Sequence, residues 1–185
     1  QVIGDPVSQP STDLPTTDLV GREVELAYLG GWIRNVLAGR SRPLLVEGEP
    51  GIGKTTLLRA VRAEVLREGA RALVITPIPS ASSLGLGGLG AVVQQLRSLA
   101  CGADADAVEP LYRALEDPSA RANPLTLAGG LIALLAAAAE VEPIVLIVDD
   151  GQWLDHSSAE VLVAALRGLE LDRVGLLVAV RSGDP

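Results

Sequence analysis

Lys54 is the single lysine among the fifteen Lys and Arg residues of this chain. It lies in the sequence Gly-Glu-Pro-Gly-Ile-Gly-Lys-Thr, which runs from Gly48 to Thr55. The spacing G-x-x-x-x-G-K-[ST] is that of a phosphate-binding loop (P-loop), whose glycines let backbone N–H groups surround phosphate oxygens. A compact ammonium can reach the β- and γ-phosphates, and the Thr55 hydroxyl is placed to bind Mg²⁺. The loop residues expected to bind nucleotide are Glu49, Pro50, Gly51, Ile52, Gly53, Lys54, Thr55 and Thr56.

Two acidic residues, Asp149 and Asp150, directly follow the apolar run 144–148. If that run is a parallel strand, both carboxylates lie at its C-terminal end, where such sheets bind ligands. Hydrolysis of a phosphate ester needs a metal anchor and a residue that activates water. We therefore expect Asp149 to hold Mg²⁺, directly or through water, and Asp150 to orient or deprotonate the attacking water. Gln152, two residues further on, could contact the γ-phosphate or that water.

A third candidate, Arg181, ends the apolar run 174–180. We expect this run to form the strand beside 144–148, so that the arginine approaches the γ-phosphate. A fixed cation at that point could distinguish ATP from ADP.

These residues need a scaffold of strands and helices, and the hydrophobic pattern predicts one. Strands are expected at 44–46, 72–76, 144–148 and 174–180. Helices are expected at 19–37, at 55–68 with a stop at Gly69, within 84–139, and at 157–168 with a capping box from Ser157 to Glu160. Strands that alternate with helices and read as continuous apolar runs predict a parallel sheet covered on both faces. The expected fold is therefore a P-loop NTPase of the α/β class, a three-layer α/β/α sandwich, over 19–185 after an extended arm at 1–18.

Composition limits the function classes. The net charge of −8 argues against a nucleic-acid-binding surface on this segment, because such surfaces are normally basic. Cys101 is the only cysteine, which excludes an internal disulfide and a cysteine-based zinc cluster. The longest apolar stretch, 125–139, is too short for a membrane span, and we interpret it as a buried helix. With no signal peptide recognised, we expect a cytoplasmic protein without a membrane partner.

The glycines from Gly85 to Gly90 match the dinucleotide-binding pattern G-x-G-x-x-G. We reject that interpretation because prolines and serines separate them from the preceding strand, and no strand ending in an acid follows at the expected distance. A loop with leucine anchors is expected instead.

Several of these segments together resemble the ATPase region of the STAND class of signalling ATPases, within the AAA+-related P-loop proteins (an ASCE-type core). The resemblance is strongest to large ATP-binding regulators of the LuxR family. It rests on Leu-Val-Gly-Arg-Glu-Val-Glu-Leu at 19–26, on the loop at 48–56, on Val-Leu-Ile-Val-Asp-Asp-Gly-Gln-Trp-Leu-Asp at 145–155, and on 178–181.

The resemblance implies a switch in which ADP holds the resting form and ATP the active oligomer. It places Val20, Gly21 and Arg22 near the adenine. It implies that Lys54 and Thr55 bind the phosphate and Mg²⁺ and that Asp149 and Asp150 have the Walker B roles. It gives Arg181 the role of a sensor. Family members continue into a lid, a winged-helix segment, helical repeats and a C-terminal helix-turn-helix that binds DNA, none of which is included in these 185 residues. They hydrolyse ATP slowly, which fits an Asp at position 150 in place of the Glu of faster ATPases.

Three alternatives to a slow, Mg²⁺-dependent ATPase switch stay open at this point. The chain could bind ATP and ADP without turnover, or it could be an initiator-like AAA+ ATPase acting on DNA, which the acidic net charge disfavours. A small-molecule kinase would need an acceptor pocket and lid arginines that the sequence does not indicate.

Overall fold

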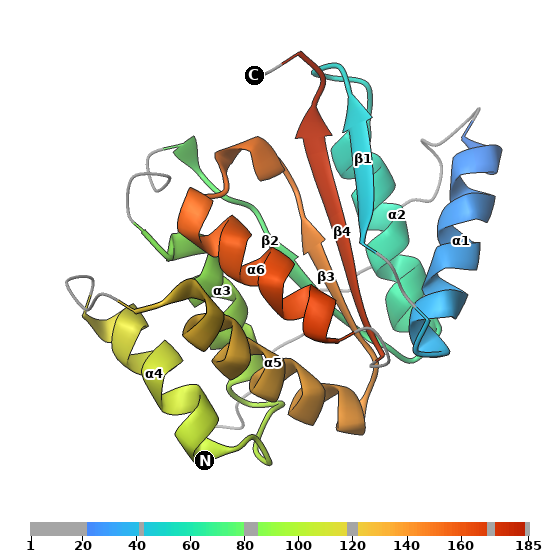
Figure 1. Cartoon of the computed structure of the whole chain (residues 1–185). Coiled ribbons are helices and arrows are strands. Elements are labelled where there is room, and N and C mark those ends of the chain that lie inside the picture. The colour runs from blue at the N-terminus through green and yellow to red at the C-terminus, as the bar shows by residue number, and fades with distance from the viewer. Residues whose placement is uncertain (1–21, 41–42, 80–84, 118–121, 170–172, 184–185) are drawn as a thin grey trace, which may run out of the picture.

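Four parallel strands form the centre of the molecule, with helices on both faces (Figure 1). The computed structural model describes residues 22–40, 43–79, 85–117, 122–169 and 173–183. The strands are β1 (Leu44–Gly48), β2 (Arg71–Ile75), β3 (Ile144–Val148) and β4 (Val174–Arg181), in the spatial order β1-β4-β3-β2. Every neighbouring pair is parallel. The predicted α/β class with a parallel sheet is confirmed.

The helices form an outer layer on each face of the sheet. They are α1 (Glu23–Leu37), α2 (Lys54–Arg67), α3 (Gly87–Leu96), α4 (Ala105–Glu116), α5 (Pro124–Val141) and α6 (His156–Gly168), with a 3₁₀ turn, η3 (Gly151–Trp153). Helices α1 and α2 pack on one face with Val145 and Ile147 of β3. Helices α3, α5 and α6 pack on the other with Leu146 and Val148, while α4 lies outside α5 (Figure 1). This alternation of strand side chains between the two faces produces the predicted three-layer sandwich.

Burial differs between the central and outer strands. All five residues of β3 are buried, as its apolar run predicted. The same expectation was wrong for β1, where Leu45 is 60% exposed, and for β2, where Val74 is 37% exposed. Both strands lie at the edges of the described sheet, where the helix layers do not cover every outward position.

Helix α2 matches its sequence prediction in both packing and length. Its apolar residues Leu57, Leu58, Val61 and Val65 are all buried. The helix ends before Gly69, whose φ of +75° is a left-handed conformation that glycine adopts without strain. Helix α1 begins at Glu23, and the predicted start at 19–21 lies outside the described residues.

Two local predictions need correction. Residues 87–90 belong to α3 rather than to a loop, because the N-terminus of that helix is docked on Asp155 and Ser158. The predicted capping box at Ser157 is also wrong. Helix α6 begins one residue earlier, and the side chain of Asp155 caps it by accepting a hydrogen bond from the Ser158 N–H at 2.9 Å.

Among the described helices, α5 alone is long and apolar enough to cross a membrane by length and composition. It packs against α4 and α6, and Leu131, Leu134 and Leu135 are almost fully buried in the core. The interpretation as a buried helix is confirmed.

Candidate active site

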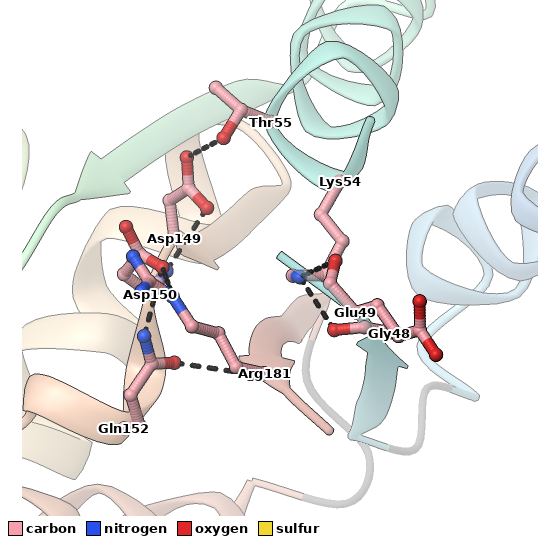
Figure 2. A network of polar contacts seen from close by, with 8 residues as sticks. All are labelled: Gly48, Glu49, Lys54, Thr55, Asp149, Asp150, Gln152 and Arg181. Atoms are coloured by element: carbon pink, nitrogen blue, oxygen red, sulfur yellow. Dashed lines mark hydrogen bonds and ion pairs between the residues drawn. The ribbon is translucent and has the colours of Figure 1, made fainter. Parts of the chain in front are cut away.

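The candidate residues gather at the C-terminal ends of β1, β3 and β4 (Figure 2). Strand β4 lies between β1 and β3, and Gly48 of β1 pairs with Arg181 of β4 in the register of the sheet. The predicted adjacency of β3 and β4 is therefore confirmed. The sequence had not indicated that β4 would also border β1, which brings Arg181 between the loop and the two aspartates.

The loop that follows β1 depends on two glycines with positive φ. Gly51 has a φ of +79° and Gly53 a φ of +95°. A methyl group added at either position would meet no atom within 4 Å, so the demand for glycine comes from the backbone and not from space. Gly53 is the N-cap of α2, whose positive N-terminal end therefore opens on the loop.

Lys54 folds back across this loop. Its Nζ donates to the carbonyl oxygens of Gly48 at 2.7 Å and Glu49 at 3.0 Å (Figure 2). The ammonium and the loop backbone thus lie together. Glu49 accepts the bond from Lys54 through its backbone carbonyl oxygen. The residues Glu49, Pro50 and Ile52 are all exposed. Thr56 lies half-buried in the first turn of α2.

Thr55 and Asp149 meet although 94 residues separate them. The Thr55 hydroxyl donates to Oδ2 of Asp149 at 2.8 Å, and Asp149 is only 9% exposed. A hydroxyl and a carboxylate side by side are the hard oxygen donors that Mg²⁺ accepts together with phosphate oxygens and water. In the described part of the chain, no three His, Cys, Asp or Glu side chains cluster as a metal site. The pair therefore suits a metal that a bound phosphate helps to hold.

Asp150 has two partners in the site. Its Oδ1 accepts from Gln152 Nε2 at 2.9 Å and from Arg181 Nε at 3.3 Å, while Gln152 Oε1 accepts from the Arg181 backbone N–H at 3.3 Å (Figure 2). The hydrogen bond from Gln152 lowers the pKa of Asp150 from its ordinary value. Burial opposes this, and the charges of Arg181 and Lys54 reinforce it. The carboxylate is thus ionised at neutral pH and weakly basic.

Gly151 supports this arrangement and was not recognised from the sequence. A methyl group at this position would lie 2.5 Å from Cγ1 of Val178 and 3.3 Å from the Ala179 carbonyl oxygen. The turn η3 therefore packs directly on β4, which holds Asp150 and Gln152 near Arg181. The only signal in the sequence was a glycine after two aspartates, which equally suits an ordinary turn.

Arg22 is the described member of the set expected near the adenine, and Val20 and Gly21 lie outside the described residues. Its Nη2 donates to the carbonyl oxygen of Ile52 at 2.7 Å, and its Nη1 pairs with Glu25 at 3.3 Å. The structure thus brings Arg22 to the backbone of the phosphate loop.

This chain is similar to several known proteins. Residues 18–179 match the profile of the AAA ATPase domain. An uncharacterized protein of Rhizobium meliloti (strain 1021) is 28% identical over 177 residues, which cover 80% of this chain but only 17% of that protein. The solved structure of the Aeropyrum pernix ORC2 protein, described as ADPNP–ADP complexes, is similar in fold, with a TM-score of 0.56 at 18% identity over 92% of this chain and 43% of that one. The structure of PCH-2 from C. elegans has a TM-score of 0.44 at 14% identity, over 88% of this chain and 38% of that one.

Proposed function

Because the chain belongs to the AAA ATPase domain family, we propose that it binds ATP and ADP between β1 and α2 and hydrolyses ATP slowly with Mg²⁺. One observation carries the proposal. The loop with Lys54, the Thr55–Asp149 pair and the Asp150–Arg181 pair occupy one edge of the sheet. Phosphate, metal and water would each meet a suitable group there.

Each group has a distinct role in this proposal. The loop backbone and Lys54 bind the β- and γ-phosphates, and the N-terminus of α2 favours their negative charge. Thr55 and Asp149 hold Mg²⁺, which would offset the charge that develops on the phosphates. Asp150 orients the attacking water, and Arg181 lies where it can meet the γ-phosphate.

Slow turnover is supported by the contacts of Asp150. A good general base has a pKa near the working pH, whereas Gln152 and Arg181 hold the pKa of Asp150 low. Both contacts also occupy Oδ1, which a water would otherwise approach. The same contacts favour the second candidate, a module that binds ATP and ADP without turnover.

The biological role we propose is that of a conformational switch in a cytoplasmic regulator of the LuxR type. Support comes from the sequence at 19–26 and from the apolar run with its following aspartates at 145–155. In this proposal the ATPase core at 19–185 follows an arm at 1–18. The chain spans 17% of the length of its Rhizobium relative. In this proposal a helix-turn-helix elsewhere in the protein binds DNA, and ATP promotes self-association. The net charge of −8 disfavours the initiator-like alternative, in which this segment itself acts on DNA.

Calorimetric titration with ADP and with Mg²⁺-ATP tests the binding site. We expect saturable binding by the wild-type chain and a loss of about tenfold or more in Lys54→Ala, because a charged hydrogen-bond donor to phosphate is removed. Arg59→Ala is the matched control, since it removes the same charge from an exposed position of α2. Wild-type affinity in a folded Lys54→Ala variant, or no binding by the wild type, would contradict the proposal.

A further inference from the structure

Arg22 reaches from the start of α1 to the phosphate loop. It is 30 residues from Ile52 in the sequence, yet its Nη2 donates to the Ile52 carbonyl oxygen at 2.7 Å. The side chain is 28% exposed, and Glu25, in the first turn of α1, contacts its Nη1 at 3.3 Å. A planar guanidinium can serve both acceptors at once, which an ammonium on a flexible stem does less well. Glu25 therefore orients the group that holds the loop.

The contact fixes the orientation of one peptide in the loop. The described residues contain no cis peptide bond, so the Ile52 carbonyl and the Gly53 N–H point in opposite directions across a planar unit. While Arg22 holds the carbonyl, the Gly53 N–H is turned away from Arg22. Gly53 directly precedes Lys54, and phosphate-binding loops act through backbone N–H groups at this position of the motif. Without Arg22, the Ile52–Gly53 peptide could rotate, because glycine is conformationally permissive. The loop would then lose the Gly53 N–H as a donor to phosphate.

We infer that Arg22 is a positioning residue that pre-organises the phosphate loop for polyphosphate by holding the Ile52–Gly53 peptide. The inference rests on the proposed nucleotide site and adds to it. Resemblance alone placed Arg22 near the adenine, and the two roles differ in their consequences. An adenine contact affects only ligands that carry the base, whereas a fixed loop affects any ligand that carries the phosphates.

Inorganic tripolyphosphate, which has no base, distinguishes the two roles. Calorimetric titrations with Mg²⁺-tripolyphosphate and with ADP would compare the wild type with Arg22→Ala. We expect Arg22→Ala to weaken both ligands by the same factor, about tenfold, since a charged hydrogen bond that orders the binding site is lost. Arg34→Ala is the matched control, because it removes an exposed arginine from the same helix without touching the loop.

Amide hydrogen exchange without ligand gives a second, independent measurement. We expect the loop at 49–53 to exchange faster in Arg22→Ala than in Arg34→Ala, with equal unfolding midpoints for the two variants. If Arg22→Ala fails to fold, Glu25→Gln carries the same comparison, with an expected loss of about twofold to threefold for both ligands.

Each other result has a defined meaning. A loss of ADP affinity with unchanged tripolyphosphate affinity would assign Arg22 to the base and overturn the inference. Unchanged affinity for both ligands would overturn it as well, and so would a wild-type chain that binds ADP but not tripolyphosphate. A wild-type chain that binds neither ligand would instead contradict the proposed function itself.

Discussion

Replacement of Asp155 by alanine should destabilise the fold far more than the loss of an ordinary helix cap. The Asp155 carboxylate is 6% exposed and serves two helices. Its Oδ1 accepts from the N–H groups of Ser158 in α6 and of Leu86 at the start of α3, both at 2.9 Å, and its Oδ2 accepts from Gly88 at 3.1 Å. One carboxylate therefore caps the N-termini of both helices.

The magnitude follows from these three hydrogen bonds. Loss of one N-cap costs about 1 kcal/mol, and each further N–H group left without an acceptor in a buried place costs about 1 kcal/mol or more. We expect Asp155→Ala to lower the free energy of unfolding by about 3 kcal/mol. Asp104→Ala should lower it by about 1 kcal/mol. Asp104 is the matched control, because it caps α4 through a single exposed contact with the Asp106 N–H.

Urea denaturation of the wild type and both variants measures the difference. At neutral pH, Asp155→Ala should be about 2 kcal/mol less stable than Asp104→Ala. Equal losses in the two variants would refute the shared cap. We do not expect Asp155→Ala to lose nucleotide affinity, since Asp155 contacts none of the residues proposed to bind the nucleotide.

The pH dependence of the same difference is a further test. Burial raises the pKa of Asp155, but the hydrogen bonds from Gly88, Ser158 and Leu86 outweigh it and hold the pKa below its ordinary value. The stabilisation is therefore fully present above the pKa of the unfolded carboxyl, about 3.9, and is lost as the pH falls through the folded pKa. The gap between wild type and Asp155→Ala should narrow in acid, and a gap that widens there would contradict this account.

Three further predictions concern the candidate site. Asp150→Asn should keep ADP affinity while phosphate release falls by about a hundredfold; release that is indistinguishable from background in both proteins would favour the binding module without turnover. Arg181→Ala should weaken Mg²⁺-ATP more than ADP in calorimetric titration, and an equal loss for both ligands would remove the sensor role. Gly151→Ala should lower the free energy of unfolding, measured by urea denaturation, by about 2 kcal/mol, because the added methyl group would overlap Val178. Gly129→Ala, which places a methyl group in open space on α5, should not lower it. Equal effects of the two substitutions would contradict the packing of η3 on β4.

Local patterns in the sequence were sufficient to predict most of the strands and helices. The glycines at positions 51 and 53 predicted a loop between a strand and a helix, and the structure has one, in which both glycines have positive φ. The spacing of Leu57, Leu58, Val61 and Val65 predicted the buried side of α2. An apolar run ending in Asp149 predicted the central strand β3. These predictions succeeded because φ, helical period and burial on both faces leave a mark within a few neighbouring residues.

Predictions failed where a distant partner decided the outcome. The exposure of β1 depends on its place at the edge of the sheet, which the strand order decides. The start of α6 depends on the Asp155 carboxylate, which also accepts a hydrogen bond from α3. The loop predicted at 85–90 failed for the same reason, because residues 87–90 form the start of α3. Gly88 packs closely on Leu154, and a methyl group there would lie 2.2 Å from a Leu154 side-chain carbon, which would have to move. No pattern within a short window reports a contact of this kind.

The sequence by itself thus determined which groups are available to this protein, namely a glycine-rich loop with one lysine, an acidic strand end and one arginine on a further strand. Only the tertiary structure decided how those groups meet. Strand β4 lies between β1 and β3, so Arg181 pairs with Asp150, while Arg22 crosses to the Ile52 carbonyl. The physical reason is that the chemistry of a group depends on its residue type and on local backbone geometry. Which groups contact each other depends on strand order and on packing between segments far apart in the chain.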